Sequence, residues 1–473
     1  MTDDFTYKPQ DVHYLGFLEA QLRDMQGIPT LAYELIQNAD DAPEDADGRF
    51  APTTLRFHVN DDALIVENDS VFRPLDFARL QTIASGGKRQ ERGVTGAFGL
   101  GFLAVYQITD RPEIFSNGRH WTINPDAPAE QRIVERQLET DGTRFRLPWA
   151  FDPQTAVRRT LRLSAIQPAH LDDIAAELSS AIGLAALFLQ RLHTLEVTRS
   201  GKLLRRITRR QTDNGRITLH EADGSGATWL LLSGSFNAVA EQLRSQFPWQ
   251  IEAARRSAIY LALPLTGMTG PGRLFAGLPT ATTIPPSLHI SADFFPTTDR
   301  KRIHFDGGYQ AAWNQAAITC AAETFAAALP ELRDALSPQT LWQLLQQTAY
   351  TRELADQGDA PASLAQFWQT AVLILAAHPF IYTIHQTWAL PPQTRLWNPA
   401  ENNRRPPDNA AADLLARLNI PLVHPDLNSV FPLLRRPEIG APDLQITDIA
   451  AALAQLGLTR PTALADAPPP LNS

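Results

Sequence analysis

The sequence is poor in the residues that form cross-links and basic surfaces. Its 473 residues include one cysteine, Cys320, and only four lysines, so arginine supplies nearly all of the positive charge. A single cysteine excludes an intramolecular disulfide framework and a cysteine-rich zinc site. The formal net charge of −9 argues against a general polyanion-binding surface, though not against a local basic patch.

Long hydrophobic runs are also missing. The longest, near 181–189 and 371–377, reach about half of a membrane span or less. The first residues are acidic where a secretory signal would be basic, so we expect a cytoplasmic protein without a membrane partner. With 44% hydrophobic and 20% charged residues, the composition is that of a globular protein, and the length suggests two to four domains.

The most informative stretch is LAYELIQNADDA, residues 31–42, which predicts an amphipathic helix because apolar residues recur at four-residue spacing. Glu34 and Asn38 are four residues apart and therefore lie one turn apart on the same face, and Asp41 continues along that side. These polar groups are costly to bury without ligands. From the residues alone, an ordinary solvent-exposed face remains an equal alternative.

A hairpin is predicted after this helix. Thr53–Val59 and Ala63–Glu67 have the composition of strands and are joined by Asn60-Asp61-Asp62. The second strand runs directly into Asp69 and Ser70. An aspartate at a strand end can bind a ligand, but it can equally form a turn.

A glycine-rich segment follows a predicted helix at 72–84. Residues 85–95 are mostly charged or glycine, include Lys88, and suit a mobile lid. The sequence GAFGLGF then leads into a predicted helix, FLAVYQITD. Glycines allow the backbone to approach phosphates closely, and a helix N-terminus attracts anions. The candidate phosphate-binding residues are Gly96, Phe98, Gly99, Gly101 and Phe102. No strand leads directly into these glycines, which excludes a dinucleotide-binding motif.

A fourth pattern, Asp141-Gly142-Thr143, precedes a predicted strand at 144–147. Taken alone it is a turn. Its position after the other three patterns makes Thr143 a further candidate site residue.

These four motifs, in this order over roughly residues 34 to 147, resemble those of the GHKL ATPases. That superfamily includes the ninety-kilodalton heat-shock chaperone, gyrase B and MutL. The sequence Gln-Asn-Ala-Asp-Asp is most similar to that of its sacsin branch. The resemblance implies an α+β fold class: a two-layer α/β sandwich of the GHKL (Bergerat) type, followed by a mixed α/β middle domain and a helical C-terminal region.

The resemblance also implies a role for each motif, with ATP and Mg²⁺ as cofactors. Glu34 would be the general base that orients the attacking water, and Asn38 would coordinate the magnesium ion. Asp69 would accept a hydrogen bond from the adenine amino group, and the Thr143 hydroxyl would take part in the same hydrogen-bond network around the base. The family commonly has glycines after this aspartate, whereas Ser70 and Val71 follow here, which leaves the details of the adenine contact open.

We expect three regions along the chain. Residues 1–149 would form the ATP-binding domain with an N-terminal arm and the lid, 150–335 the middle domain, and 336–473 a helical region with irregular proline-rich segments. Alternating segments between 193 and 232 predict an antiparallel sheet in the middle domain. The Pro-rich end at 467–470 predicts disorder or a linker.

The loop 296–302 is the candidate phosphate sensor of the middle domain. In the related ATPases an arginine on such a loop reaches the terminal phosphate. By that likeness Arg300 is the first choice, with Lys301 and Arg302 as alternates, since a cation there stabilises charge on the transferring phosphoryl group. A basic loop that only caps a strand is the alternative interpretation.

Together these features predict an ATP-hydrolysing conformational switch, chaperone-like or clamp-like, that acts on a macromolecular client or effector protein. Two alternatives remain. One is a nucleic-acid-associated clamp of the MutL or MORC type that closes as a homodimer, as part of bacterial genome defence. The overall acidity leans against it. The other is a nucleotide-sensing scaffold with little turnover, against which Glu34 argues because a sensor needs no general base.

Overall fold

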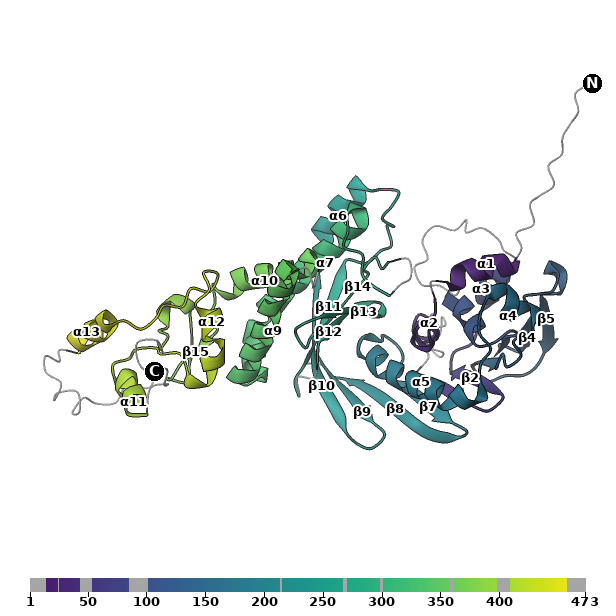
Figure 1. Cartoon of the computed structure of the whole chain (residues 1–473), viewed down its shortest axis with the longest axis horizontal. Coiled ribbons are helices and arrows are strands. Elements are labelled where there is room, and N and C mark those ends of the chain that lie inside the picture. The colour runs from purple at the N-terminus through teal and green to yellow at the C-terminus, as the bar shows by residue number, and fades with distance from the viewer. Residues whose placement is uncertain are drawn as a thin grey trace, which may run out of the picture.

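The chain is a mixed α/β protein built on one large mixed sheet (Figure 1). The computed structural model describes residues 14–23, 25–42, 53–84, 101–212, 215–266, 270–297, 301–357, 361–397 and 409–456. The sheet has 14 strands in the order β13-β12-β14-β11-β10-β9-β8-β7-β1-β2-β6-β3-β4-β5. Figure 1 shows α2 (Ile28–Asp40) and α5 (Leu171–Ala185) between the part of the sheet that ends at β13 and the part that carries β2.

One half of the sheet is formed mainly by the N-terminal third of the chain. Its strands are β1 (Thr54–Val59), β2 (Ala63–Asn68), β3 (Glu113–Ser116), β4 (Arg119–Ile123), β5 (Ile133–Gln137), β6 (Thr143–Pro148) and β7 (Thr194–Arg199). The predicted hairpin is confirmed as the antiparallel pair β1–β2. β1 pairs parallel with β7, so the sheet continues from here into the second half.

Helices cover this half of the sheet: α1 (Tyr14–Leu22), α2 (Ile28–Asp40), α3 (Pro74–Ala84), α4 (Ala156–Leu161) and α5 (Leu171–Ala185). The helix predicted for residues 31–42 is confirmed as α2. It begins earlier than expected, with Pro29 in its first turn. Its apolar side packs on α5 and on the 3₁₀ helix η1 (Gly101–Gln107). The segment expected to form a helix after the glycines is therefore shorter and more tightly wound than predicted.

The second half of the sheet contains β8 (Lys202–Gln211), β9 (Arg216–Glu221), β10 (Gly226–Ser235), β11 (Ala258–Pro264), β12 (Gly272–Ala276), β13 (Leu278–Ile284) and β14 (His289–Ala292). The antiparallel order expected between residues 193 and 232 is confirmed by the pairs from β7 to β10. The β12–β13 edge is important for the site, because β13 contacts both α2 and α5.

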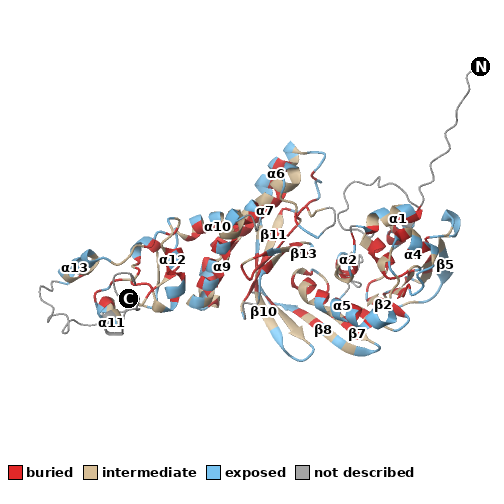
Figure 2. Ribbon diagram, viewed as in Figure 1, coloured by how far each residue is buried: buried red, intermediate tan, exposed pale blue. Residues whose placement is uncertain are grey.

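Long helices pack beside this second half: α6 (Asn237–Gln246), α7 (Gly308–Ala327), α8 (Leu329–Ala335), α9 (Pro338–Gln357) and α10 (Ala362–Leu375). Trp313, Trp342 and Trp368 are buried on α7, α9 and α10. Figure 2 shows buried positions along α7, α9 and α10. Shorter elements follow: β15 (Ile381–Tyr382), β16 (Trp388–Ala389), α11 (Asn409–Arg417), α12 (Phe431–Leu434) and α13 (Ile446–Gln455).

Buried apolar residues form one cluster from Tyr14 to Ile207 and another from Leu230 to Ala441, with a small third cluster near the last helices. The first cluster continues beyond residue 149 because α5 packs on α2 and β7. The domain bounds given above stay predictions. In the part of the chain that the structure describes, no helix is long and apolar enough to cross a membrane. The proline-rich end lies outside the described residues.

Candidate functional site

Two polar side chains of α2 are buried in the wall of a large cavity. Glu34 and Asn38 have 8% and 7% of their surface exposed and both line this cavity. The Nδ2 atom of Asn38 is buried and forms no hydrogen bond within the described chain. A buried polar atom without a partner is costly, so Asn38 is a position where a ligand can supply the missing contact. Its carboxamide can offer either a donor or an acceptor.

Gly101, the first residue of η1, lies directly against Glu34. A Cβ atom at this position would overlap the carboxylate of Glu34, so the close approach requires glycine. Gly101 also lines the cavity. Phe102 is instead buried in the core, with its ring 5.7 Å from that of Phe145. The other predicted phosphate-binding residues, Lys88, Gly96, Phe98 and Gly99, lie outside the described residues.

A row of three buried polar residues crosses the ends of β2, β6 and β3. Thr143 lies opposite Asn68 on one side and opposite Ser116 on the other. The hydroxyls of Ser116 and Thr143 are 2.8 Å apart, and Thr143 donates to the Ser70 carbonyl at 2.8 Å. Thr143 is 1% exposed and does not line the cavity, whereas Asn68 and Ser70 do. Thr143 thus holds the segment after β2 in place.

Asp69, the predicted base-reading residue, lies elsewhere. Its carboxylate accepts hydrogen bonds from the backbone of Thr53 and Thr54 and from the Thr53 hydroxyl, and it is not among the residues that line the cavity. The physical reason is strand alternation, which turns successive side chains to opposite faces. Asn68 is on the helix-covered face with Val66, so its neighbour Asp69 is not. The residue that the structure places at the cavity is Asn68.

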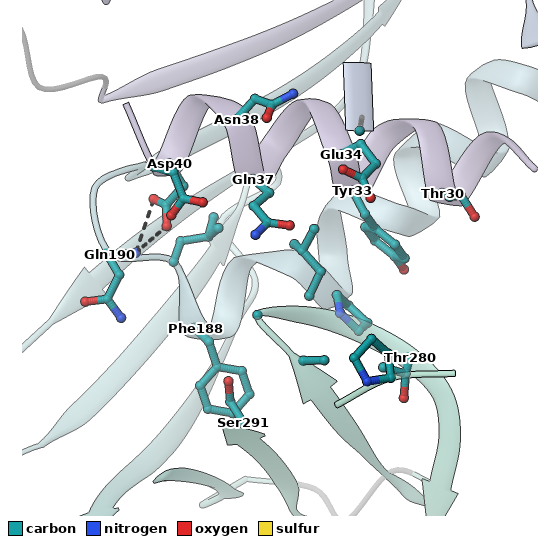
Figure 3. Close-up of a pocket in the computed structure, with 18 of the residues that line it drawn as sticks. Thr30, Tyr33, Glu34, Gln37, Asn38, Asp40, Phe188, Gln190, Thr280 and Ser291 are labelled. Atoms are coloured by element: carbon teal, nitrogen blue, oxygen red, sulfur yellow. Dashed lines mark hydrogen bonds between the residues drawn. The ribbon is translucent and has the colours of Figure 1, made fainter. Parts of the chain in front are cut away.

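The two aspartates at the end of α2 have different surroundings. Asp40 is buried and accepts hydrogen bonds from the backbone N–H groups of Gln190, Arg191 and Leu192 at 2.8 Å each. It therefore fixes the chain between α5 and β7 to the end of α2 (Figure 3). Asp41 is exposed to the cavity. Desolvation there and the nearby charge of Asp40 raise the pKa of Asp41 to about 6.

The opposite wall of the cavity carries positive charge. Lys301, from the predicted phosphate-sensing loop, lines the cavity, and its backbone carbonyl accepts a 2.6 Å hydrogen bond from Ala281 in β13. Arg300 lies outside the described residues. Arg273 of β12 also lines the cavity and donates to the Thr280 carbonyl at 2.6 Å. Burial raises the pKa of Tyr33 on α2, and the positive charge of Arg273 opposes this shift, which places the guanidinium near α2.

The cavity has a volume of about 1140 Å³ and lies between α2, the end of α5 and the strands β11–β14. Figure 3 shows Tyr33 and Gln37 pointing from α2 toward the strands that carry Thr280 and Ser291. Arg256, before β11, is another cation of this region. Asp293 raises the pKa of Arg256, and Asp41 adds to the shift from the side of α2. The cavity therefore has an acidic helix on one side and basic strands on the other.

Within the described ranges, no group of three or more His, Cys, Asp or Glu side chains is arranged to hold a metal ion.

Of the predicted site residues, the structure brings together Glu34, Asn38, Asp41, Gly101 and Lys301 around the cavity. Sequence reasoning missed Asn68, Asp40 and Arg273. Alternation of apolar residues along β2 could have identified Asn68. Nothing in the local sequence marks Arg273, which reaches the cavity because β13, the neighbour of β12, packs against α2.

Comparison with known proteins gives a partial match to one family. The family model described as "Sacsin domain" matches residues 17–137. Sacsin from Homo sapiens is 34% identical over 121 residues, which are 24% of this chain and 3% of that protein. Protein NO VEIN from Arabidopsis thaliana is 35% identical over 91 residues, 19% of this chain and 3% of that protein. The N-terminal region is therefore sacsin-like, and the chain spans only a small part of the length of these relatives.

Solved structures add little. A crystal structure of the N-terminal domain of a DNA repair protein matches with a TM-score of 0.35 and 10% sequence identity, covering 67% of this chain and 99% of that chain. A match of this quality supports no argument about function.

Proposed function

We propose that this protein is a Mg²⁺-dependent ATPase that works as a conformational switch. The observation that supports it best is the pairing of Glu34 and Asn38, buried one turn apart in a cavity wall, with Gly101 directly against the Glu34 carboxylate. A buried carboxylate with no side chain between it and the cavity can orient a water molecule for attack on a phosphoryl group.

The described residues fit a metal–nucleotide complex. Magnesium in proteins commonly keeps several waters and is held by one or two side chains together with substrate phosphates. Asn38 is the side chain that would hold the ion, through its carboxamide oxygen, because the unpartnered nitrogen can only donate a hydrogen bond. When bound, the ion would neutralise phosphate charge. Glu34 accepts the proton of the attacking water, while Lys301 and Arg273 face the cavity from the opposite wall and stabilise the negative charge that develops.

The switch follows from the two walls belonging to different parts of the sheet. Glu34 and Asp41 lie on or at the end of α2, whereas Arg256, Arg273 and Lys301 lie on or beside β11–β14. Binding a magnesium–nucleotide complex between these two groups would draw the two halves together, and its hydrolysis would release them. In this proposal the N-terminal half is the α/β sandwich of the GHKL type, and its movement acts on a macromolecular partner, as a monomer or a homodimer in the cytoplasm.

The test is ATP binding and hydrolysis by the purified chain, beside the variant Glu34→Ala. Glu177→Gln is the matched control, because Glu177 is an exposed carboxylate of α5 that lines the same cavity. We expect both variants to bind ATP and only Glu34→Ala to lose turnover, by about 10²-fold or more. Binding without turnover in the wild type would instead identify a nucleotide sensor. Failure of the wild type to bind ATP would overturn the proposal.

A further inference from the structure

The hydrogen-bond donors at the end of β2 can be assigned one by one. Thr143 donates its only hydroxyl proton to the Ser70 carbonyl, so in its contact with Ser116 the proton comes from Ser116. The Ser116 oxygen also accepts a 2.8 Å hydrogen bond from the Phe72 backbone N–H. Each of these hydroxyl protons therefore has an acceptor inside the protein, and none is left for a ligand.

The orientation of the Asn68 carboxamide is fixed by the same network. The Ser70 backbone N–H and the Ser70 hydroxyl both donate to one atom of Asn68, at 3.1 and 2.6 Å. A backbone N–H can only donate, so that atom is the carbonyl oxygen Oδ1. Asn68 also lines the cavity, and the group that it has left to offer there is the amino group Nδ2.

The wall around Asn68 suits the uncharged part of a nucleotide. Asn68, Ser70, Val71 and Phe72 are neutral and line one stretch of the cavity. The charged residues that follow pair with one another around the start of α3, where Asp76 lies 3.3 Å from Arg73 and 3.8 Å from Arg79. The carboxamide nitrogen of Asn38, which has no hydrogen-bond partner within the described chain, and the Glu34 carboxylate are on α2 instead.

We infer that Asn68 sets the base specificity of this site by donating a hydrogen bond to the purine. This rests on the proposed nucleotide site. A carboxylate at the cavity would accept a hydrogen bond from the exocyclic amino group of adenine. The Nδ2 group of Asn68 instead requires an acceptor, which is a ring nitrogen in adenine and the 6-carbonyl oxygen in hypoxanthine or guanine. The site therefore takes 6-oxopurine nucleotides as well as ATP.

The test compares the affinities of ATP and inosine triphosphate, which differ at the 6-position of the base, by titration calorimetry on the full chain. We expect inosine triphosphate to bind the wild type within about threefold of ATP or more tightly, since the Nδ2 group of Asn68 finds a hydrogen-bond acceptor on either base. Asn68→Asp replaces Nδ2 by an acceptor, while the two Ser70 donors keep the carboxylate ionised. This variant should shift the affinity ratio toward ATP by about tenfold.

Asp69→Asn is the matched control, because Asp69 makes its hydrogen bonds to Thr53 and Thr54 and should leave the ratio unchanged. Melting temperatures show whether each variant is folded. A wild-type preference for ATP of tenfold or more, or an unchanged ratio in folded Asn68→Asp, would overturn this inference alone. Failure of the wild type to bind either nucleotide would overturn the proposed function and the inference with it.

Discussion

The carboxylate of Glu34 lies where a side chain on Gly101 would have to begin. The conformation of Glu34 therefore depends on the absence of a Cβ atom on a different element, the 3₁₀ helix η1. Because packed interiors have little free space, any residue larger than glycine at position 101 must displace either the carboxylate or the helix.

Gly101→Ala should lower ATP turnover by at least about tenfold, since a shift of a catalytic group by 1 Å is already costly. It should also lower the melting temperature, because overpacking destabilises by about 1–3 kcal/mol. The control is the same substitution in Glu34→Ala, where the overlapping carboxylate is gone. There the alanine at 101 should cost little stability. An equal loss of melting temperature in both backgrounds would contradict the contact.

Asp40→Asn should destabilise the junction between α2 and β7. The carboxylate accepts three backbone N–H groups of residues 190–192, and an amide has only one oxygen to offer them. A buried donor left unpaired costs about 1–3 kcal/mol. We expect a lower melting temperature and faster hydrogen exchange at these three amides, measured by mass spectrometry. Glu177→Gln should change neither, and unchanged exchange in Asp40→Asn would show that the contact is not maintained in solution.

The pKa of Asp41 predicts a dependence of stability on pH. Desolvation and Asp40 raise this pKa to about 6, whereas an aspartate in an unfolded chain has a pKa of about 3.9. The folded state binds the proton more tightly, so ionisation of Asp41 opposes folding. This cost is absent below about pH 4, grows between pH 4 and 6, and is fully present above pH 6.

The measurement is the melting temperature of wild type and Asp41→Asn at pH 4, 5, 6 and 7. The variant should gain stability relative to the wild type as the pH rises from 4 to 6, with no further change above. Because the Asp41 side chain is exposed to the cavity, solvent screening keeps the difference small. Parallel curves across this range would mean that the carboxyl titrates as it does in the unfolded chain.

The sequence was sufficient for features set by local spacing. Glu34 and Asn38 share a helix face because they are four residues apart, and the structure confirms that face as buried. At the end of β2 the sequence analysis named Asp69, whereas in the structure the neighbouring Asn68 lines the cavity. Asn68 and Asp69 are both polar, and the resemblance favoured the acidic one because a carboxylate can accept a hydrogen bond from adenine. In the structure Leu64, Val66 and Asn68 alternate onto the face of β2 that the helices cover, so Asn68 is the residue that reaches the cavity.

Other parts of the site depend on contacts between distant segments. Asp40 binds backbone groups 150 residues further along the chain, and no side-chain pattern reports such an acceptor. Arg273 reaches α2 only because β12 and β13 fold back toward it, with Gly277 at their turn near Gln37. The sequence contains many arginines, and nothing local distinguishes the one that lines the cavity.

The loop that follows β14 offers a direct comparison between adjacent cations. Lys301 lines the cavity, whereas Arg302 is exposed and does not. Lys301→Ala should therefore lower ATP turnover by about 10²-fold with a much smaller loss of affinity, because a cation opposite Glu34 acts mainly on charge that develops during phosphoryl transfer. Arg302→Ala is the control and should retain both.

Single-turnover kinetics separate this effect from product release. Arg300→Ala belongs in the same series, since the resemblance makes Arg300 the first choice. If Arg300→Ala removes turnover and Lys301→Ala does not, the cation predicted from the sequence is the one that acts, and Lys301 only lines the wall. If neither variant affects turnover while Arg273→Ala does, the charge is supplied by the strand β12, and the loop has no part in the chemistry.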